Sequence, residues 1–202
     1  MGESAGGVER NEILAHVLAK DSQQPQDEPL IASNINEQLQ HMGLSTWSIS
    51  LQRRLRDAVG RLQPKTLLEV GASIGHRTAW LMDLFEREQR TLQALTLVEQ
   101  GGKFGVLLQR LLQRYDALDW STVVVGDPER LAAEHQAWKL ASATATELSQ
   151  TPFEPAYDVI VVDGPSSVRA ELVSTYLPLL QPNGVLFTVE PDMPTGDVAE
   201  DD

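Results

Sequence analysis

The sequence predicts an α/β domain in which a doubly wound, mostly parallel sheet lies between two layers of helices. From residue 64 onwards five short apolar runs recur, and a longer amphipathic segment follows each of the first four. Strands buried on both faces read as continuous apolar runs, and strand–helix alternation produces right-handed crossovers into a parallel sheet. The predicted strands are 66–70, 94–98, 122–125, 157–162 and 184–189. The predicted helices between them are 78–90, 103–115, 128–148 and 167–180.

Length and composition fit one globular domain with a sizeable core. The chain has 202 residues, of which 42% are hydrophobic and 22% charged. Residues 1–45 are expected to form N-terminal helices and a linker, because a short amphipathic patch precedes a Gln/Asp/Pro-rich run. Residues 46–192 form the predicted α/β domain, and residues 193–202 an acidic tail. The helical stretches between residues 30 and 62 are expected to serve as a lid or brace.

Charge and residue usage exclude several classes of function. The 16 Lys and Arg residues face 29 Asp and Glu residues, so the formal net charge is −13. An acidic surface repels phosphate groups, and we therefore expect neither nucleic-acid nor membrane binding. The absence of cysteine excludes disulfides, thiolate zinc sites and cysteine nucleophiles. No run approaches the roughly 18 apolar residues of a membrane span, which favours a cytoplasmic protein.

The first predicted strand ends in a turn with the sequence EVGASIG, which we call the glycine turn: Glu69, Gly71, Ser73 and Gly75. In open α/β sheets ligands bind outside the carboxyl ends of the strands, where glycines let backbone amides approach and the helix N-terminus favours negative charge. The turn therefore suits a nucleotide-like ligand. The alternative is that the glycines serve only the turn, which often needs positive φ.

Three later strands also end in polar residues. Glu99 ends the second strand and can accept hydrogen bonds from both hydroxyls of a ribose, although it can equally be a solvated carboxylate. Gly126 and Asp127 follow the third strand; Asp127 is either an N-cap before Pro128 or a contact to an adenine edge. Asp163 follows the fourth strand, where a carboxylate is costly unless it is solvated, paired or used, and we favour use in chemistry.

In this order, together with the segment LLQPNGV at 179–185, these features resemble class I S-adenosylmethionine (SAM)-dependent methyltransferases. Within that class the sequence looks most like the small O-methyltransferases related to catechol O-methyltransferase, over residues 45–192. The resemblance implies a Rossmann-like methyltransferase fold, SAM as cofactor and O-methylation of a small-molecule acceptor. It implies that the glycine turn holds the methionine part of SAM, Glu99 the ribose, and Gly126 and Asp127 the adenine. It places Asp163 beside the transferred methyl group, as the catalytic residue.

The sequence departs from this family in two places. Metal-dependent relatives carry an Asp-Asn pair at the end of the fifth strand, where this chain has Glu190 and Asp192. A Mg²⁺ site made by these two residues and Asp163 is chemically possible but is not favoured, and no metal ligand is assigned. The family also continues past the fifth strand with a helix and an antiparallel strand pair, whereas this chain stops 12 residues after Glu190. We therefore expect a shortened sheet whose edge is covered by another chain, as in a homodimer.

Two residues beside the glycine turn are open to more than one interpretation. Arg77 can pair with the carboxylate of the cofactor or lie on a helix surface, and His76 can act as a base or be incidental.

Two other functions remain to be weighed against methyl transfer. The first is a non-catalytic cofactor-binding or interaction protein on the same fold, which the shortened sheet motivates. The second is a nicotinamide-dependent oxidoreductase, although the chain lacks Gly-x-Gly-x-x-Gly and a Tyr-x-x-x-Lys pair.

Overall fold

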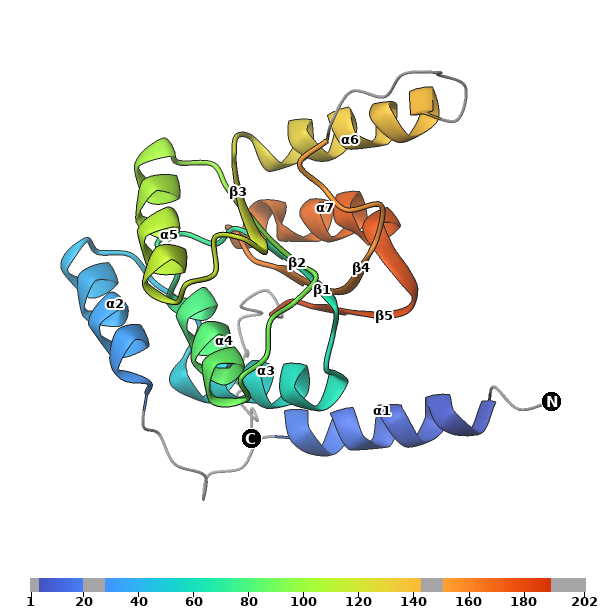
Figure 1. Ribbon diagram of the computed structural model, residues 1–202, viewed down its shortest axis with the longest axis horizontal. Coiled ribbons are helices and arrows are strands. Elements are labelled where there is room, and N and C mark those ends of the chain that lie inside the picture. Colours follow the sequence, from blue (N-terminus) through green and yellow to red (C-terminus); the bar gives the residue numbers. More distant parts are fainter. Residues whose placement is uncertain (1–3, 20–27, 143–150, 190–202) are drawn as a thin grey trace, which may run out of the picture.

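A five-stranded, wholly parallel sheet forms the centre of the molecule (Figure 1). The computed structural model describes residues 4–19, 28–142 and 151–189, without the side chains of residues 4–9. The strand order is β3-β2-β1-β4-β5. The strands are β1 Thr66–Val70, β2 Ala94–Glu99, β3 Ser121–Val125, β4 Tyr157–Val162 and β5 Leu180–Phe187. The predicted α/β class is confirmed, and the first four strands agree with their predicted bounds to within one residue.

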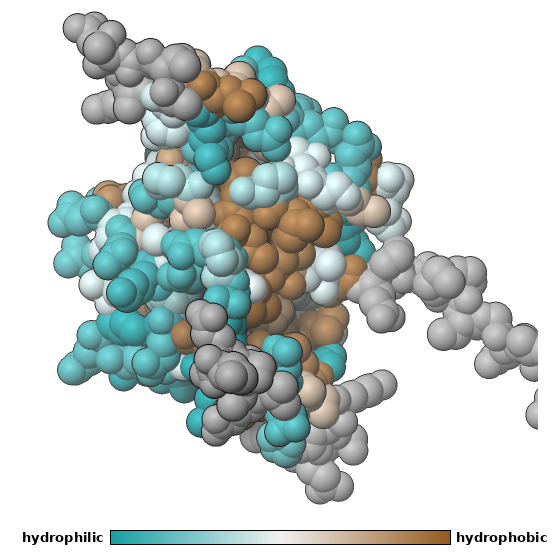
Figure 2. Space-filling view, turned by 90° about the vertical axis from the view of Figure 1, so that its right-hand side faces the viewer, coloured by the Kyte–Doolittle hydropathy of each residue, from teal (hydrophilic) through white to brown (hydrophobic). Residues whose placement is uncertain are grey.

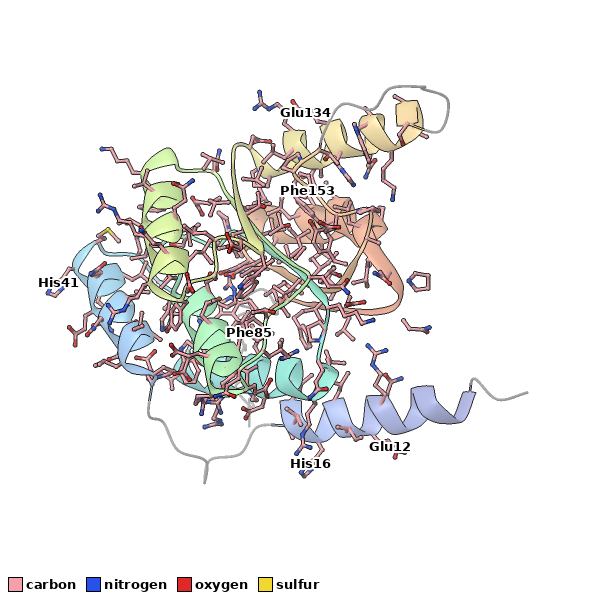
Figure 3. The ribbon with its side chains drawn as sticks, viewed as in Figure 1. Glu12, His16, His41, Phe85, Glu134 and Phe153 are labelled. Atoms are coloured by element: carbon pink, nitrogen blue, oxygen red, sulfur yellow. The ribbon has the colours of Figure 1, made fainter. Side chains whose placement is uncertain are left out.

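Helices cover both faces of the sheet. They are α1 Ser4–Leu18, α2 Leu30–His41, α3 Ile49–Leu62, α4 His76–Arg87, α5 Gly102–Arg114, α6 Pro128–Ser142 and α7 Ser166–Tyr176. Alternate residues of a strand point to opposite faces, so Leu67 packs with Phe85 of α4 and Leu68 with Phe153, which precedes β4. Figure 3 labels the two phenylalanines on opposite sides of the sheet. The helices α3, α4 and α5 thus lie on one face and α6 and α7 on the other.

The change of face between α5 and α6 makes the carboxyl ends of β1 and β4 a topological switch point, and we use the word crevice for this position in the fold. The chain runs from β1 to β2 and β3 in one direction, then crosses back to place β4 and β5 on the other side of β1. The connections leaving β1 and β4 therefore diverge. Open α/β sheets bind ligands at such a topological switch point.

The N-terminal helices α1 and α2 form an outer layer, in which α1 packs on α3 and α2 on α4. Helix α3 begins after Ser48, whose hydroxyl accepts a hydrogen bond from the Leu51 amide (3.4 Å), and it packs on α1 and α4. Helix α2 buries Ile35 and Leu39 against a cluster that includes Trp80 of α4. The role of these helices as a lid or brace stays a prediction. No helix in the described ranges is long and apolar enough to cross a membrane.

Two predicted boundaries near the C-terminus are wrong. The helix predicted over 167–180 ends at Tyr176 and passes into a 3₁₀ turn, Leu177–Leu179, because Pro178 has no N–H to continue the helix. Strand β5 was predicted over 184–189 but starts at Leu180 and ends at Phe187. Its pairing with β4 is irregular, since Tyr157 faces Leu180 while Val159 faces Val185. Proline is tolerated in this strand because it lies at an edge of the described sheet.

Candidate cofactor site

The glycine turn connects β1 to α4 at the switch point, and packing explains its two glycines. Gly71 has φ +77°, and a Cβ there would lie 2.5 Å from the backbone oxygen of Asp163. Gly75 has φ +91°, and a Cβ there would lie 2.5 Å from Leu111. Ser73 also adopts a left-handed conformation, with φ +54°. Backbone conformation and packing therefore account for both glycines without a bound ligand. The close approach of Gly71 to Asp163 brings the ends of β1 and β4 together.

Glu99 fastens the ends of β1 and β2 to each other. One carboxylate oxygen accepts a hydrogen bond from the Ser73 amide (2.7 Å), and the other accepts one from the Gly101 amide (2.8 Å). The side chain is 8% exposed, so it is not the freely solvated carboxylate of the alternative interpretation. Each oxygen keeps a second lone pair, and the carboxylate is held in a fixed orientation beside the glycine turn.

A buried ion-pair triad occupies the crevice. Arg77, in the first turn of α4, reaches Glu69 Oε1 with Nε (3.0 Å) and Asp163 Oδ2 with Nη1 (2.9 Å). Its Nη2 donates a hydrogen bond to the backbone oxygen of Gly71 (2.9 Å). Glu69 is fully buried and also accepts a hydrogen bond from the Thr78 hydroxyl (2.8 Å). The interpretation of Arg77 as a helix-surface residue is therefore wrong: the side chain is only 3% exposed and joins the ends of β1 and β4.

Burial and charge act in opposite directions on the two acids. Burial raises the pKa of Glu69, and this effect exceeds the lowering by Arg77 and Thr78. Burial alone would also raise the pKa of Asp163, but Arg77 and the backbone amide of Gly164 outweigh it, so the pKa is lowered. Asp163 is thus the more firmly ionised of the two acids.

Trp47 covers the guanidinium of Arg77. The ring centroid lies 4.5 Å from the Arg77 Cζ atom, a cation–π arrangement, and the indole is 9% exposed. Trp47 belongs to the segment between α2 and α3, so the N-terminal layer contributes directly to the crevice.

His76 stands beside the crevice in a second buried network. Its Nε2 lies 2.7 Å from Glu28 Oε1, and its Nδ1 lies 2.9 Å from the Thr46 hydroxyl and 3.2 Å from the Gln52 amide nitrogen. The Gln52 amide nitrogen can only donate a hydrogen bond, so Nδ1 of His76 is the acceptor. The proton therefore lies on Nε2, which donates to Glu28. Burial lowers the pKa of His76, against the raising effect of Glu28. This geometry does not support His76 as a solvent-accessible base, because its ring is 2% exposed and both ring nitrogens have partners.

The residues after β3 lie apart from the triad. The Asp127 carboxylate accepts a hydrogen bond from the Arg130 amide (2.9 Å) and caps α6, in agreement with the N-cap interpretation of this residue. The Gly126 amide donates to the backbone oxygen of Glu99 (3.0 Å), which keeps this turn beside the end of β2. The adenine contact remains a prediction.

Among the described residues no group of three His, Asp or Glu side chains is placed to hold a metal ion. Glu190 and Asp192, two members of the Mg²⁺ site that was considered, lie outside the described residues.

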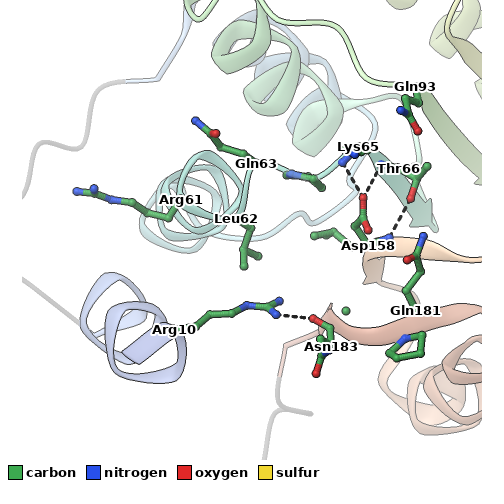
Figure 4. Close-up of a pocket in the computed structure, with 14 residues that line it drawn as sticks. Arg10, Arg61, Leu62, Gln63, Lys65, Thr66, Gln93, Asp158, Gln181 and Asn183 are labelled. Atoms are coloured by element: carbon green, nitrogen blue, oxygen red, sulfur yellow. Dashed lines mark hydrogen bonds between the residues drawn. The ribbon is translucent and has the colours of Figure 1, made fainter. Parts of the chain in front are cut away.

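A cavity of about 700 Å³ lies at the opposite, amino ends of the strands (Figure 4). There Asp158 accepts hydrogen bonds from the Lys65 and Thr66 amides, and Arg10 of α1 donates to the backbone oxygen of Asn183. These contacts join β1, β4 and β5 at the end of the sheet that is remote from the triad.

No protein-family model and no curated protein matches the sequence. Solved structures of methyltransferases do match the fold. An O-methyltransferase from Streptomyces achromogenes involved in tomaymycin synthesis, in complex with SAM, matches with a TM-score of 0.58 and 17% identity, covering 92% of this chain and 73% of that one. A methyltransferase from Podospora anserina bound to S-adenosylhomocysteine (SAH) gives 0.58 and 16%, covering 92% and 69%. An O-methyltransferase from Bacillus cereus in complex with SAH gives 0.54 and 17%, covering 87% and 69%.

The chain therefore has the α/β, Rossmann-like fold of these methyltransferases. The fold that the resemblance implied is confirmed.

Proposed function

We propose that this protein is a SAM-dependent methyltransferase that methylates a hydroxyl oxygen of a small molecule. The observation that carries the proposal is the set of carboxylates, Glu69, Glu99 and Asp163, gathered at the carboxyl ends of neighbouring strands around the glycine turn. The fold of the matched methyltransferases supports it.

The residues of the crevice fit SAM by their chemistry. Two of its groups, the sulfonium and the ammonium, are cations, and three carboxylates are set here against two guanidinium groups, those of Arg77 and Arg169. Glu99, fixed by two backbone amides, has free lone pairs for the two ribose hydroxyls. The glycine turn would hold the methionine part, and Gly126 and Asp127 would line the adenine. When bound, SAM supplies an electrophilic methyl group.

Asp163 orients the acceptor in this proposal. Its lowered pKa makes it a poor base at neutral pH but a permanent acceptor for a hydrogen bond from a hydroxyl. Its 23% exposure leaves it accessible at the crevice, unlike Glu69. Aligning the hydroxyl and excluding water are the main contributions that the protein can make to such a transfer.

The first experiment is calorimetric titration of the full chain with SAH and, in parallel, with NAD⁺. We expect micromolar binding of SAH and none of NAD⁺. Glu99→Ala should weaken SAH binding by about 10- to 100-fold, the effect of losing hydrogen bonds to a charged group. Glu134→Ala is the matched control, because Glu134 points outward from α6 and is 61% exposed (Figure 3). Binding of NAD⁺ in place of SAH would refute the proposal in favour of hydride transfer.

A transfer assay with labelled SAM and a panel of phenols and catechols then tests catalysis. Asp163→Asn should reduce the turnover of any acceptor that is found, and unchanged turnover would contradict the role given to Asp163. The alternative function is cofactor binding without catalysis. It is favoured by the engagement of Glu99 and Asp163 with protein groups, and it predicts SAH binding without transfer to any acceptor.

We also propose that the chain forms a homodimer. Figure 2 shows an apolar patch on the side of the molecule where β5 ends the described sheet. Leu177, in the turn directly before β5, is 52% exposed, and Leu180, Val185 and Leu186 of β5 are only partly buried. Light scattering should report a dimer that Leu177→Asp weakens; a monomer at high concentration would contradict it. The cytoplasmic location stays a prediction.

A further inference from the structure

The three partners of Arg77 are not equivalent. Glu69 is fully buried and is anchored a second time by the Thr78 hydroxyl, so losing Arg77 would leave a charge without solvent access. The Gly71 carbonyl is part of the turn itself. Asp163 differs, because it is 23% exposed and a second guanidinium, that of Arg169, lies 3.9 Å from its other oxygen. Asp163 is thus the one partner of the three that can be replaced at Arg77 without leaving a buried charge unpaired.

The guanidinium itself is held in place on its other sides. Glu69 Oε1 forms an ion pair with Nε, the Gly71 carbonyl accepts a hydrogen bond from Nη2, and the Trp47 ring covers the flat face of the guanidinium, with its centroid 4.5 Å from Cζ. Only the Nη1 edge, which now points to Asp163, faces a partner that can be exchanged. A pre-oriented guanidinium edge is the group that best recognises a carboxylate.

We propose that Arg77 is the specificity-determining residue for the amino-acid end of the cofactor. The α-carboxylate replaces Asp163 at the Nη1 edge of Arg77, and the α-ammonium pairs with the displaced Asp163 Oδ2, which leaves Oδ1 to accept from the acceptor hydroxyl. This proposal rests on the proposed function, because it assumes that the ligand of the crevice carries an amino-acid group.

The exchange leaves neither charge unpaired: one internal ion pair is replaced by two ion pairs with the ligand. Before binding, Arg77 and Asp163 neutralise each other; after binding, each has one opposite charge from a zwitterion. A ligand without the amino-acid group leaves the Arg77–Asp163 ion pair intact and gains no binding free energy from these two residues. A ligand with an ammonium but no carboxylate would separate the pair and leave Arg77 with a partner fewer. The site should therefore select the zwitterion.

The test compares two ligands by calorimetry: SAH, and 5′-methylthioadenosine, which has the same adenosine and thioether but no amino-acid group. The wild-type chain should bind SAH at least about 10-fold more tightly, as expected for a charge-assisted pair. Arg77→Met should remove this preference by weakening SAH while leaving 5′-methylthioadenosine within about twofold of wild type. Arg87→Met is the control, because Arg87 lies on the same helix, is 56% exposed and should change neither affinity.

If Arg77→Met alone fails to fold, Glu69→Gln/Arg77→Met is compared with Glu69→Gln, since the double variant removes the buried charge together with its partner and the single variant shows the effect of Glu69 alone. The double variant should show the same loss of preference. An unchanged preference for SAH in the folded variant, or an equal loss of both ligands, would overturn the inference while leaving the proposed function standing. Failure of the wild-type chain to bind either ligand would overturn the proposed function and the inference with it.

Discussion

The buried triad makes a specific prediction about stability. Replacing Arg77 with Met leaves Glu69 fully buried with only the Thr78 hydroxyl as a side-chain partner. Removing one member of a buried ion pair costs about 3–5 kcal/mol of the free energy of unfolding. At about 2–4 °C per kcal/mol for a domain of this size, the melting temperature should fall by roughly 6–20 °C.

The raised pKa of Glu69 predicts how the free energy of unfolding changes with pH. Burial raises the pKa of Glu69 above its unfolded value of 4.5, so the folded state binds a proton that the unfolded state has lost. This contribution to stability is present below that value and is lost as the pH rises through the folded pKa. Removing Arg77 takes away a charge that lowers this pKa. The variant should therefore lose more stability between pH 5 and pH 8 than the wild type does.

Thermal and urea unfolding of three proteins would measure this: wild type, Arg77→Met and Glu69→Gln/Arg77→Met. The double variant should be less destabilised than the single one, because no unpaired charge is left in the core. A loss below about 1 kcal/mol in the single variant, or a double variant that is worse than the single, would show that the Glu69–Arg77 pair does not stabilise the fold as described.

Three further predictions concern the surroundings of the triad. Burial lowers the pKa of His76 below its unfolded value, so its contribution to stability is complete above pH 6.5 and is lost as the pH falls below that value; His76→Gln should flatten this part of the stability profile in unfolding experiments from pH 5 to 8. Gly71→Ala should destabilise the chain by about 1–3 kcal/mol in urea unfolding, because φ is +77° and the added Cβ meets the Asp163 backbone, and a neutral effect would contradict that close approach. Asp127→Ala should cost about 0.5–2 kcal/mol through loss of the cap, whereas Asp127→Asn should keep it; if SAH affinity falls in both variants while stability falls in only one, Asp127 contacts the ligand as well.

The sequence was most informative where burial on both faces leaves a continuous apolar run. Strand β1 was predicted with its observed bounds, and the end of each strand then placed Glu69, Glu99 and Asp163 at one edge of the sheet. Parallel strands in a doubly wound sheet make this placement a consequence of topology. Strand β5 was predicted less well, because its first residues include a proline and a left-handed asparagine, which are typical of a turn.

The pairing inside the site was not predictable from local patterns. Arg77 and Asp163 are 86 residues apart, and Glu28 and His76 are 48 apart, so only the packed fold brings them together. The sequence held one signal for Arg77: an arginine in the first turn of a helix that begins beside two strand-end carboxylates is well placed to form ion pairs with them. For Glu28, which precedes α2, the sequence offered no comparable signal.

The contact between Glu28 and His76 has a consequence for any shortened version of this protein. The residues before α2 look dispensable, yet a chain that starts at residue 30 would lose the carboxylate that receives the His76 proton donor at 2.7 Å. The imidazole, in the first turn of α4 next to Arg77, would then be held only on its Nδ1 side, by Thr46 and Gln52. A shortened chain that keeps this contact must therefore begin before residue 28, well upstream of the first strand.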